Sequence, residues 1–166
     1  MIIGGQAVLL YGFPRLTRDI DITLGIDTDK LPLIKNVCRK LSLNLLVNNP
    51  ERFAAETKVL PAEEKKIRIR IDFIFSFTSY EKQAIRRARK VLMAGYPVKF
   101  ASCEDVVVHK MIAGRAIDEE DVRNILIKNK KKIDPKYIRR WLAKFGEVPG
   151  QKDLLERFHR LLKLTS

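Results

Sequence analysis

Three aspartates in two stretches of alternating sequence have the spacing of metal ligands. Acidic and apolar side chains alternate in DIDITLG, residues 19–25, and the alternation is strict in IRIRIDFIF, residues 67–75. Because side chains in a strand alternate between its two faces, Asp19 and Asp21 point to the same face. If the two strands are neighbours, Asp72 joins them. Carboxylates in such a group suit Mg²⁺ or Mn²⁺ rather than zinc.

A pair of glycines, Gly4 and Gly5, opens the helix that we expect over residues 5–12. A glycine-rich helix start offers free backbone N–H groups and a positive dipole end to a phosphate. The carboxylates follow 14 and 16 residues beyond Gly5. A phosphate-binding turn followed by metal-binding carboxylates predicts a site for a metal-bound nucleoside triphosphate (NTP).

Each of these features also has a plain structural interpretation. A Gly-Gly pair is often only a tight turn, and an Asp-x-Asp strand is often a solvated edge; their ordered combination with Asp72 favours function. His109 and His159 are isolated and offer no competing ligand set. Cys38 and Cys103 are too few for a disulfide framework or a structural zinc site.

The loop before the first strand supplies further candidates for nucleotide binding, namely Arg15, Thr17 and Arg18. Either arginine can neutralise triphosphate oxygens, since a guanidinium binds them in a bidentate manner. The alternative for Arg18 is an ion pair with the neighbouring aspartates.

The order of elements predicts an α/β (α+β) chain, with a mixed sheet flanked by helices and an all-helical carboxy-terminal part. In the first part we expect helices at 5–12, 30–41 and 79–90, strands at 19–25, 43–47, 56–60 and 67–75, and a hairpin of 91–93 and 98–100 turning at 95–97. In the second part we expect helices at 102–114, 118–129, 135–145 and 152–163. The predicted division is residues 1–100 and 101–166.

The composition is that of a globular protein, with 46% hydrophobic and 32% charged residues among 166. The longest uncharged apolar runs are far shorter than a membrane span, and the amino terminus lacks the basic region of a signal peptide. We therefore expect a cytoplasmic protein that does not bind a membrane.

The 33 lysines and arginines outnumber the 20 acidic residues, which gives a net charge of +13. The excess extends over both parts and favours a polyanionic partner, with nucleic acid or nucleotide first and an anionic membrane surface second. The alternative is the charged surface of a thermophile's protein. Basic clusters at 86–90 and 128–140 predict a groove for the phosphates of an acceptor between the two parts. Since no RNP-type aromatic motif is present, sequence-specific RNA recognition is not indicated.

The segment GGQAVLLYGFPRLTRDIDI resembles the signature of the DNA-polymerase-β-type nucleotidyltransferase superfamily, in which a Gly-Gly or Gly-Ser precedes an Asp-x-Asp strand. The pattern GG-x-A-x3-YG-x2-R-x-T-x-DIDI is similar to that of the minimal nucleotidyltransferases of the abortive-infection type II (AbiEii) toxin-like family. IRIDFIF fits the strand of the third carboxylate. SCEDVVVHKMIAGRAIDEEDVRNIL resembles a later motif with a lysine, an arginine and aspartates. The resemblance covers residues 1–126.

The resemblance implies a nucleotidyltransferase-type sheet and roles for particular residues. Asp19 and Asp21 would bind both metals, and Asp72 would bind the catalytic metal and help to deprotonate the attacking hydroxyl. Lys110 has apolar neighbours along its helix. A lysine in this setting usually lays its stem along the apolar surface and extends its ammonium to solvent. The resemblance makes Lys110 a catalytic candidate whose ammonium would contact the triphosphate. The later motif adds candidates for nucleotide binding, which are Arg115, Asp118 and Asp121; the alternative for Asp118 is a helix cap.

The leading interpretation is a Mg²⁺-dependent nucleotidyltransferase that acts on RNA, such as a tRNA end, and that resembles the toxin of a toxin–antitoxin pair. The rival on the same fold is an adenylyltransferase for an antibiotic such as an aminoglycoside; its cationic substrate needs an acidic pocket, whereas this chain is basic. The rival of another class is a non-catalytic nucleic-acid-binding module, against which the intact carboxylates argue. The resemblance also leads us to expect an element before Gly4, and three residues precede it here.

Overall fold

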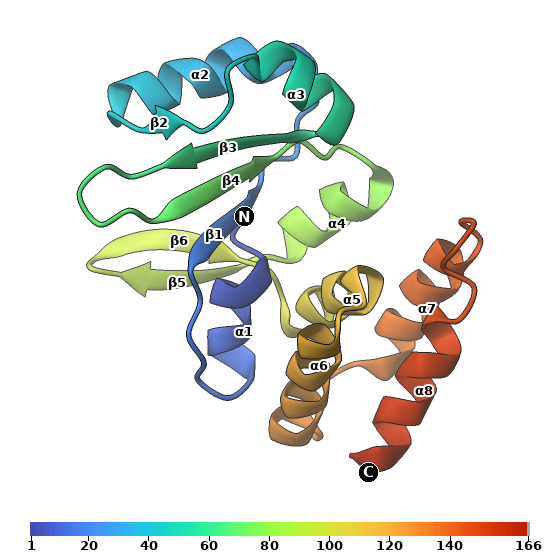
Figure 1. Cartoon of the computed structure of the whole chain (residues 1–166). Helices are drawn as coiled ribbons and strands as arrows, with labels where there is room; N and C mark the ends of the chain where they lie inside the picture. Colours follow the sequence, from blue (N-terminus) through green and yellow to red (C-terminus); the bar gives the residue numbers. More distant parts are fainter. Residues whose placement is uncertain (166) are drawn as a thin grey trace. The chain divides into compact units, whose positions relative to one another are not determined.

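A computed structural model describes residues 1–165 of the chain (Figure 1). The residues group into two compact units. The first contains residues 1–6 and 16–100, and the second contains residues 7–15 together with the chain from residue 101 onward. Residues 7–15 thus belong with the carboxy-terminal helices, although they precede the first strand in the sequence.

The first unit is built on a four-stranded sheet in the order β1-β4-β3-β2 and a separate two-stranded sheet of β5 and β6. Its strands are β1 (Asp19–Thr23), β2 (Asn44–Leu45), β3 (Val59–Glu63), β4 (Arg70–Ile74), β5 (Arg89–Met93) and β6 (Tyr96–Phe100). Its helices are α2 (Leu31–Lys40), α3 (Pro50–Thr57) and α4 (Ser79–Arg87), with a short 3-10 turn at Thr28–Lys30. The pair β1–β4 is parallel, while β4–β3 and β3–β2 are antiparallel.

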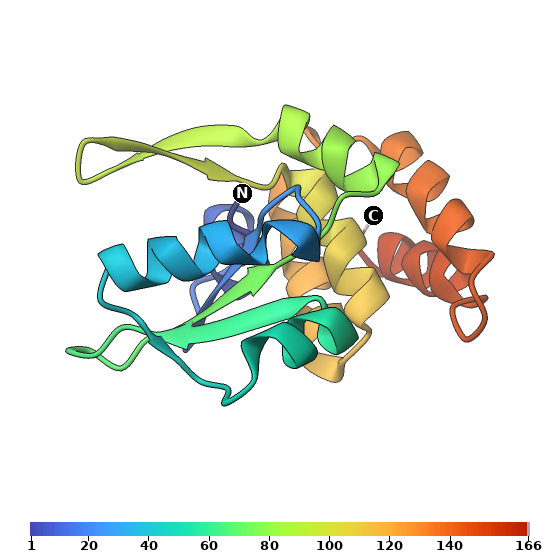
Figure 2. The same ribbon diagram turned by 90° about the horizontal axis from the view of Figure 1, so that it is seen from above.

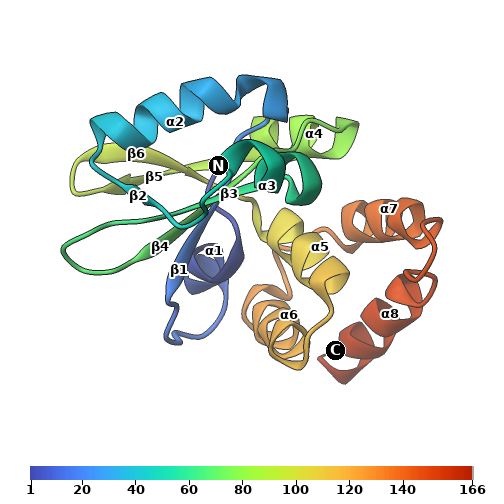
Figure 3. The same ribbon diagram turned by 45° about the horizontal axis from the view of Figure 1, so that its top comes forward.

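One face of the four-stranded sheet is covered by α2 and α3, as Figures 1 and 3 show. The core between them contains Ile34 and Cys38 of α2, Leu60 of β3 and Phe73 of β4. Burial of each large apolar side chain contributes about 1.5–3 kcal/mol. Because strand residues alternate between faces, this packing leaves the residues on either side of Phe73 on the opposite face of the sheet.

The predicted strand at 56–60 exists but starts too early: α3 runs through Thr57, and the strand begins at Val59 and continues to Glu63. Asn49 accepts a hydrogen bond from the backbone of Arg52 at 3.0 Å, and Pro50 stands at the first helical position, so α3 begins there. Lys58 adopts a left-handed conformation (φ +59°) and ends the helix, and β3 begins only at Val59.

The predicted hairpin exists, but its turn lies earlier than residues 95–97. Met93 pairs with Tyr96, so the turn consists of Ala94 and Gly95 alone. Both have positive φ angles, +48° and +84°. Two consecutive positive φ angles are typical of the two-residue turns that match the twist of a β-ribbon.

The second unit is helical. Its helices are α5 (Cys103–Ala113), α6 (Ala116–Asn129), α7 (Pro135–Gly146) and α8 (Leu154–Leu164). It also contains the end of α1 (Gly4–Tyr11), whose first turn belongs to the first unit. Ser102 caps α5 by accepting a hydrogen bond from the backbone of Asp105 at 3.2 Å, as the sequence predicts. The expectation that Asp118 caps the next helix is wrong: α6 begins at Ala116 with Arg115 as its N-cap, and the carboxylate of Asp118, at the third helical position, accepts the backbone N–H of Arg115.

The mixed α/β fold class is confirmed, with helices following the strands along the chain. Within residues 1–165, no helix has the length and apolar character needed to cross a membrane. Neither Cys38 nor Cys103 takes part in a disulfide.

Candidate functional site

Strands β1 and β4 place the predicted metal-binding aspartates on one face of the sheet. The two strands are parallel neighbours, and Asp21 pairs in register with Asp72. Asp19 lies two residues before Asp21 and therefore on the same face. The residues that follow Asp21 and Asp72, which are Ile22 and Phe73, pack into the core on the other face. The structure thus meets the condition under which the sequence predicts that the carboxylates converge.

The start of α1 lies against one of these carboxylates. Gly4 has a φ angle of +60°, and a β-carbon there would lie 1.8 Å from Oδ2 of Asp21. Only glycine fits this position, both for its backbone conformation and for its closeness to the carboxylate. The N–H of Ile3 also donates to the carbonyl of Asp21 at 3.0 Å. Gly4 and the buried Gly5 are therefore next to the candidate metal ligands.

The loop before β1 is held by the first turn of α1. Nε2 of Gln6 donates to the hydroxyl of Thr17 at 2.6 Å and to the carbonyl of Asp19 at 3.5 Å. In the first unit, Gln6 therefore fixes the position of the Thr17 side chain. Arg18 is exposed, and among the described residues it makes no ion pair with the aspartates or any other acid.

Arg70 is a member of this site that the sequence analysis does not single out. Its Nε donates to both carboxylate oxygens of Asp72, at 2.9 and 3.1 Å. The hydrogen bond to Asp72, with the negative charges of Asp72, Asp19 and Asp21, raises the pKa of Arg70 against the opposing effect of partial burial. The alternation of IRIRIDFIF places residues 70 and 72 on the same face, so the sequence does contain a signal for this pair.

The donor set fits a hard divalent cation chemically, since three carboxylates stand on two rigid neighbouring strands. As the side chains lie, no three histidine, cysteine or acidic residues between 1 and 165 are arranged to hold a metal ion. The carboxylate of Asp72 is turned onto Arg70. A cation bound by all three aspartates requires Asp72 to exchange this arginine for the metal.

The second unit gathers the residues of the later motif around a buried lysine. Nζ of Lys110, on α5, lies 2.7 Å from Oδ1 of Asp118 and 2.9 Å from Oδ2 of Asp121, both on α6. The three residues are 4%, 0% and 3% exposed. Sequence analysis predicts an ammonium that reaches a triphosphate, and in the structure this ammonium is held by two buried carboxylates.

Two arginines complete this group. Arg15 binds Asp121 through Nε and Nη2, at 2.8 and 2.9 Å, and the largely exposed Arg115 binds Asp118 through Nε at 2.6 Å. Burial on its own would raise the pKa of both carboxyls, but hydrogen bonds from the arginines and Lys110 outweigh it and lower them. Two carboxylates thus share three cations, which leaves a net charge of +1. A contact of this group with nucleotide stays a prediction.

Members of the second basic cluster make structural contacts inside their unit. Nζ of Lys128 donates to the carbonyl of Gly12 at 2.8 Å, and Nε of Arg139 donates to Nε2 of His159 at 3.1 Å. Lys144, just beyond the cluster, lies over the ring of Trp141 at 4.9 Å. The role of this cluster toward an acceptor stays a prediction.

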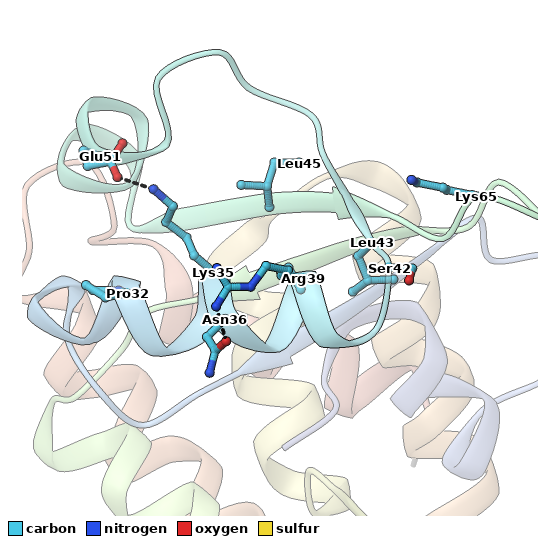
Figure 4. A pocket seen from close by; sticks show the side chains of 10 residues that line it. Pro32, Lys35, Asn36, Arg39, Ser42, Leu43, Leu45, Glu51 and Lys65 are labelled. Carbon is cyan, nitrogen blue, oxygen red and sulfur yellow. Dashed lines mark hydrogen bonds and ion pairs between the residues drawn. The ribbon is translucent and has the colours of Figure 1, made fainter.

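A cavity of about 620 Å³ opens beside α2, on the core side of the four-stranded sheet (Figure 4). Its charged lining includes Lys35, Arg39, Glu51 and Lys65. Lys35 binds Glu51, and Arg39 donates to the side chain of Asn36 at 2.7 Å (Figure 4). None of the residues predicted from sequence to bind nucleotide or metal lines this cavity.

Comparison with known families and structures adds to this geometry. The family profile described as nucleotidyl transferase AbiEii toxin, type IV TA system, matches residues 3–125, which include every predicted site residue. None of the curated proteins matches the chain significantly.

Three solved structures are similar to the chain in fold. The antibiotic-resistance factor ANT(2'')-Ia is 16% identical, with a TM-score of 0.58 over 96% of this chain and 86% of that one. An antigenic nucleotidyltransferase-like protein from Paracoccidioides brasiliensis is 16% identical, with a TM-score of 0.52 over 94% and 83%. The lincosamide antibiotic adenylyltransferase LnuA is 13% identical, with a TM-score of 0.50 over 75% and 83%. The predicted nucleotidyltransferase-type fold is confirmed.

Proposed function

This chain belongs to the AbiEii nucleotidyl transferase toxin family, and on that premise we propose that it transfers a nucleoside monophosphate from an NTP to a hydroxyl on RNA in a Mg²⁺-dependent reaction. That the protein is a nucleotidyltransferase follows from the family. The metal, the RNA acceptor and an antitoxin protein as its partner are the proposed parts.

The observation that carries the proposal is the register of β1 and β4. It places Asp21 opposite Asp72 and leaves Asp19 on the same face, next to the glycine start of α1. A structural sheet has no need to collect three like charges on one face, since like charges repel unless a cation lies between them. The arrangement supports a site that binds a metal together with a phosphate.

Each residue has a role that its position supports. Asp19 and Asp21 would hold the metal, and Mn²⁺ would fit the same donor set. When bound, such a metal supplies positive charge on the triphosphate and on the leaving pyrophosphate. Asp72, freed from Arg70, would accept the proton of the attacking hydroxyl. The N–H groups at Gly4 and Gly5 face the anionic end of the nucleotide.

The net charge of +13 supports RNA as the acceptor, because RNA brings phosphates that lysines and arginines attract. Two of the similar structures belong to an antibiotic-resistance factor and a lincosamide adenylyltransferase. Their low sequence identity to this chain supports a common fold but does not indicate which acceptor this chain uses. An aminoglycoside is a polycation, so a basic protein repels it.

The test is an incubation with each of the four NTPs, labelled on the α-phosphate, with either total RNA or an aminoglycoside. We expect label on RNA with Mg²⁺ or Mn²⁺ and none after chelation with EDTA or in Asp72→Asn. Label on the antibiotic alone would replace RNA as the acceptor. Transfer that continues in EDTA would overturn the metal dependence.

A further inference from the structure

Strands β5 and β6 form a narrow two-stranded ribbon whose turn lies at the end remote from α4 (Figures 1 and 2). One face of the ribbon is partly buried at Val91 and Val98 and fully buried at Phe100. The other face carries two cross-strand pairs, Lys90 with Lys99 and Leu92 with Pro97, and all four residues are exposed.

The lysine pair places two like charges directly opposite each other. The β-carbons of such cross-strand neighbours are about 5 Å apart, and like charges at this distance destabilise a ribbon. Within residues 1–165, neither Lys90 nor Lys99 has an ion-pair partner. The sequence offers no local counterion, because residues 82–100 contain six lysines and arginines and no acid. This face is therefore suited to a partner that brings its own negative charges.

The outer end of the ribbon adds flat and apolar surface. Tyr96 is 75% exposed and Leu92 is 74% exposed, values typical of residues without a packing role in the chain itself. Tyr96 pairs with Met93 and therefore lies on the face opposite the lysine pair, three residues or about 10 Å farther along the ribbon, so a strand that contacts both has to pass around the tip. Exposed aromatic rings that stack on bases, next to cations that follow the phosphates, are the combination by which proteins bind single-stranded nucleic acid.

We propose that the exposed face and tip of this ribbon bind a single-stranded segment of the acceptor RNA. The inference rests on the proposed function, since it names the surface that holds the acceptor. The ribbon is tied to the candidate catalytic strand, because Ile2 forms β-bridges both to Ile22 of β1 and to Phe100 of β6. This connection favours RNA, because the proposed acceptor hydroxyl is on the RNA and has to reach the candidate site on β1.

The experiment measures binding of a short, labelled, single-stranded RNA to the full chain by fluorescence anisotropy over a range of salt concentrations, without NTP. The charge variant is Lys90→Gln with Lys99→Gln, and the stacking variant is Tyr96→Ala. The control removes the same charge from exposed lysines elsewhere in the first unit, as Lys40→Gln with Lys66→Gln. A further variant, Lys90→Arg with Lys99→Arg, keeps the charge.

We expect the charge variant to make the negative slope of log affinity against log salt less steep by about 1.4. Relative to 1 M salt, this corresponds to an affinity loss of about 20-fold at 0.1 M salt. Tyr96→Ala should weaken binding by about 5- to 100-fold with an unchanged slope. The control and the arginine variant should bind as the wild type does, and thermal unfolding should show that all variants fold.

Equal RNA affinity in the wild type and both ribbon variants would overturn the inference. The inference would also be overturned if the ribbon variants lost binding to anionic phospholipid vesicles but kept the RNA affinity of the wild type. Failure of the proposed function has a different result: RNA binding that depends on the ribbon, with no label transferred to RNA from any NTP. Transfer to RNA by a ribbon variant at the wild-type rate and RNA concentration would leave the function intact and contradict the ribbon's role.

Discussion

The α-carbon of Gly4 lies so close to Asp21 that an added β-carbon would be 1.8 Å from the carboxylate oxygen Oδ2. The amino-terminal turn of α1 and the central aspartate of β1 therefore have to be placed together. A substitution at Gly4 acts on the site and on the fold at once, and the two effects can be separated with a second glycine.

Gly4→Ala should destabilise the protein by more than the backbone strain alone. An alanine in the left-handed conformation costs about 1–2 kcal/mol, and at Gly4 the clash with Asp21 is added. Gly95→Ala is the control, because its φ is +84° and a β-carbon there meets nothing within 4 Å. Thermal unfolding should show a larger decrease for Gly4→Ala, while a decrease equal to that of the control would contradict the close approach.

Arg70→Gln should reduce the concentration of Mg²⁺ needed for nucleotide binding, because Arg70 competes with a cation for Asp72. Since the side chain of Arg70 is 53% exposed, the competition is weak and the expected change is about two- to fivefold. Calorimetry of NTP binding at increasing Mg²⁺ measures it. Arg68→Gln, which removes the partner of Glu63, is the control. A lower NTP affinity at saturating Mg²⁺ would instead show that Arg70 contacts phosphate.

Asp19→Asn should abolish metal-dependent NTP binding and lower transfer by about 10³-fold, if the metal contributes several kcal/mol to the transition state. The fold should remain intact, since the substitution removes one of three like charges on the sheet. Asp29→Asn is the control, because Asp29 is exposed and forms an ion pair with its neighbour Lys30. Equal NTP affinity for the wild type and Asp19→Asn in the presence of Mg²⁺ would contradict the metal site.

The sequence predicts β1 and β4 correctly because their period-two pattern is local and uninterrupted. It misses α3, which has one large apolar side chain and so no clear helical period, although Asn49 followed by Pro50 is a helix-start signal. It also cannot place residues 7–15 in the second unit, since that assignment depends on contacts with residues beyond 100, such as the hydrogen bond from Tyr11 to the carbonyl of Ala101.

The site shows the same division between local and distant information. Asp19 and Asp21 share a face by spacing alone, whereas their closeness to Asp72 depends on the pairing of β1 with β4, which are about fifty residues apart. The ion pairs of Lys110 depend on Gly114, whose left-handed conformation (φ +66°) ends α5 before α6 packs against it. From the sequence alone, Lys110 and Asp118 are separate candidates; in the structure they form one group.

The group around Lys110 makes stability depend on pH in a direction that can be worked out. The folded-state pKa values of Asp118 and Asp121 are lowered, so the wild type gains stability from them above their unfolded value of about 3.9, and loses it as the pH falls through the folded values. Removing Lys110 takes away a hydrogen bond from each carboxylate. Burial, which raises the pKa, then has a larger weight, so the pKa values of Asp118 and Asp121 should rise.

Lys110→Met should therefore destabilise the protein most at neutral pH, by about 3 kcal/mol, near the lower end for a broken buried ion pair because Arg15 and Arg115 remain. The penalty should shrink as the pH falls toward 4, since protonated carboxyls no longer need a cation. Urea unfolding between pH 4 and pH 8 measures both effects. Lys35→Met is the control: it breaks the exposed pair with Glu51, and its effect should stay below about 1 kcal/mol. A penalty for Lys110→Met that is constant with pH would contradict the contribution of the ion pairs with Asp118 and Asp121.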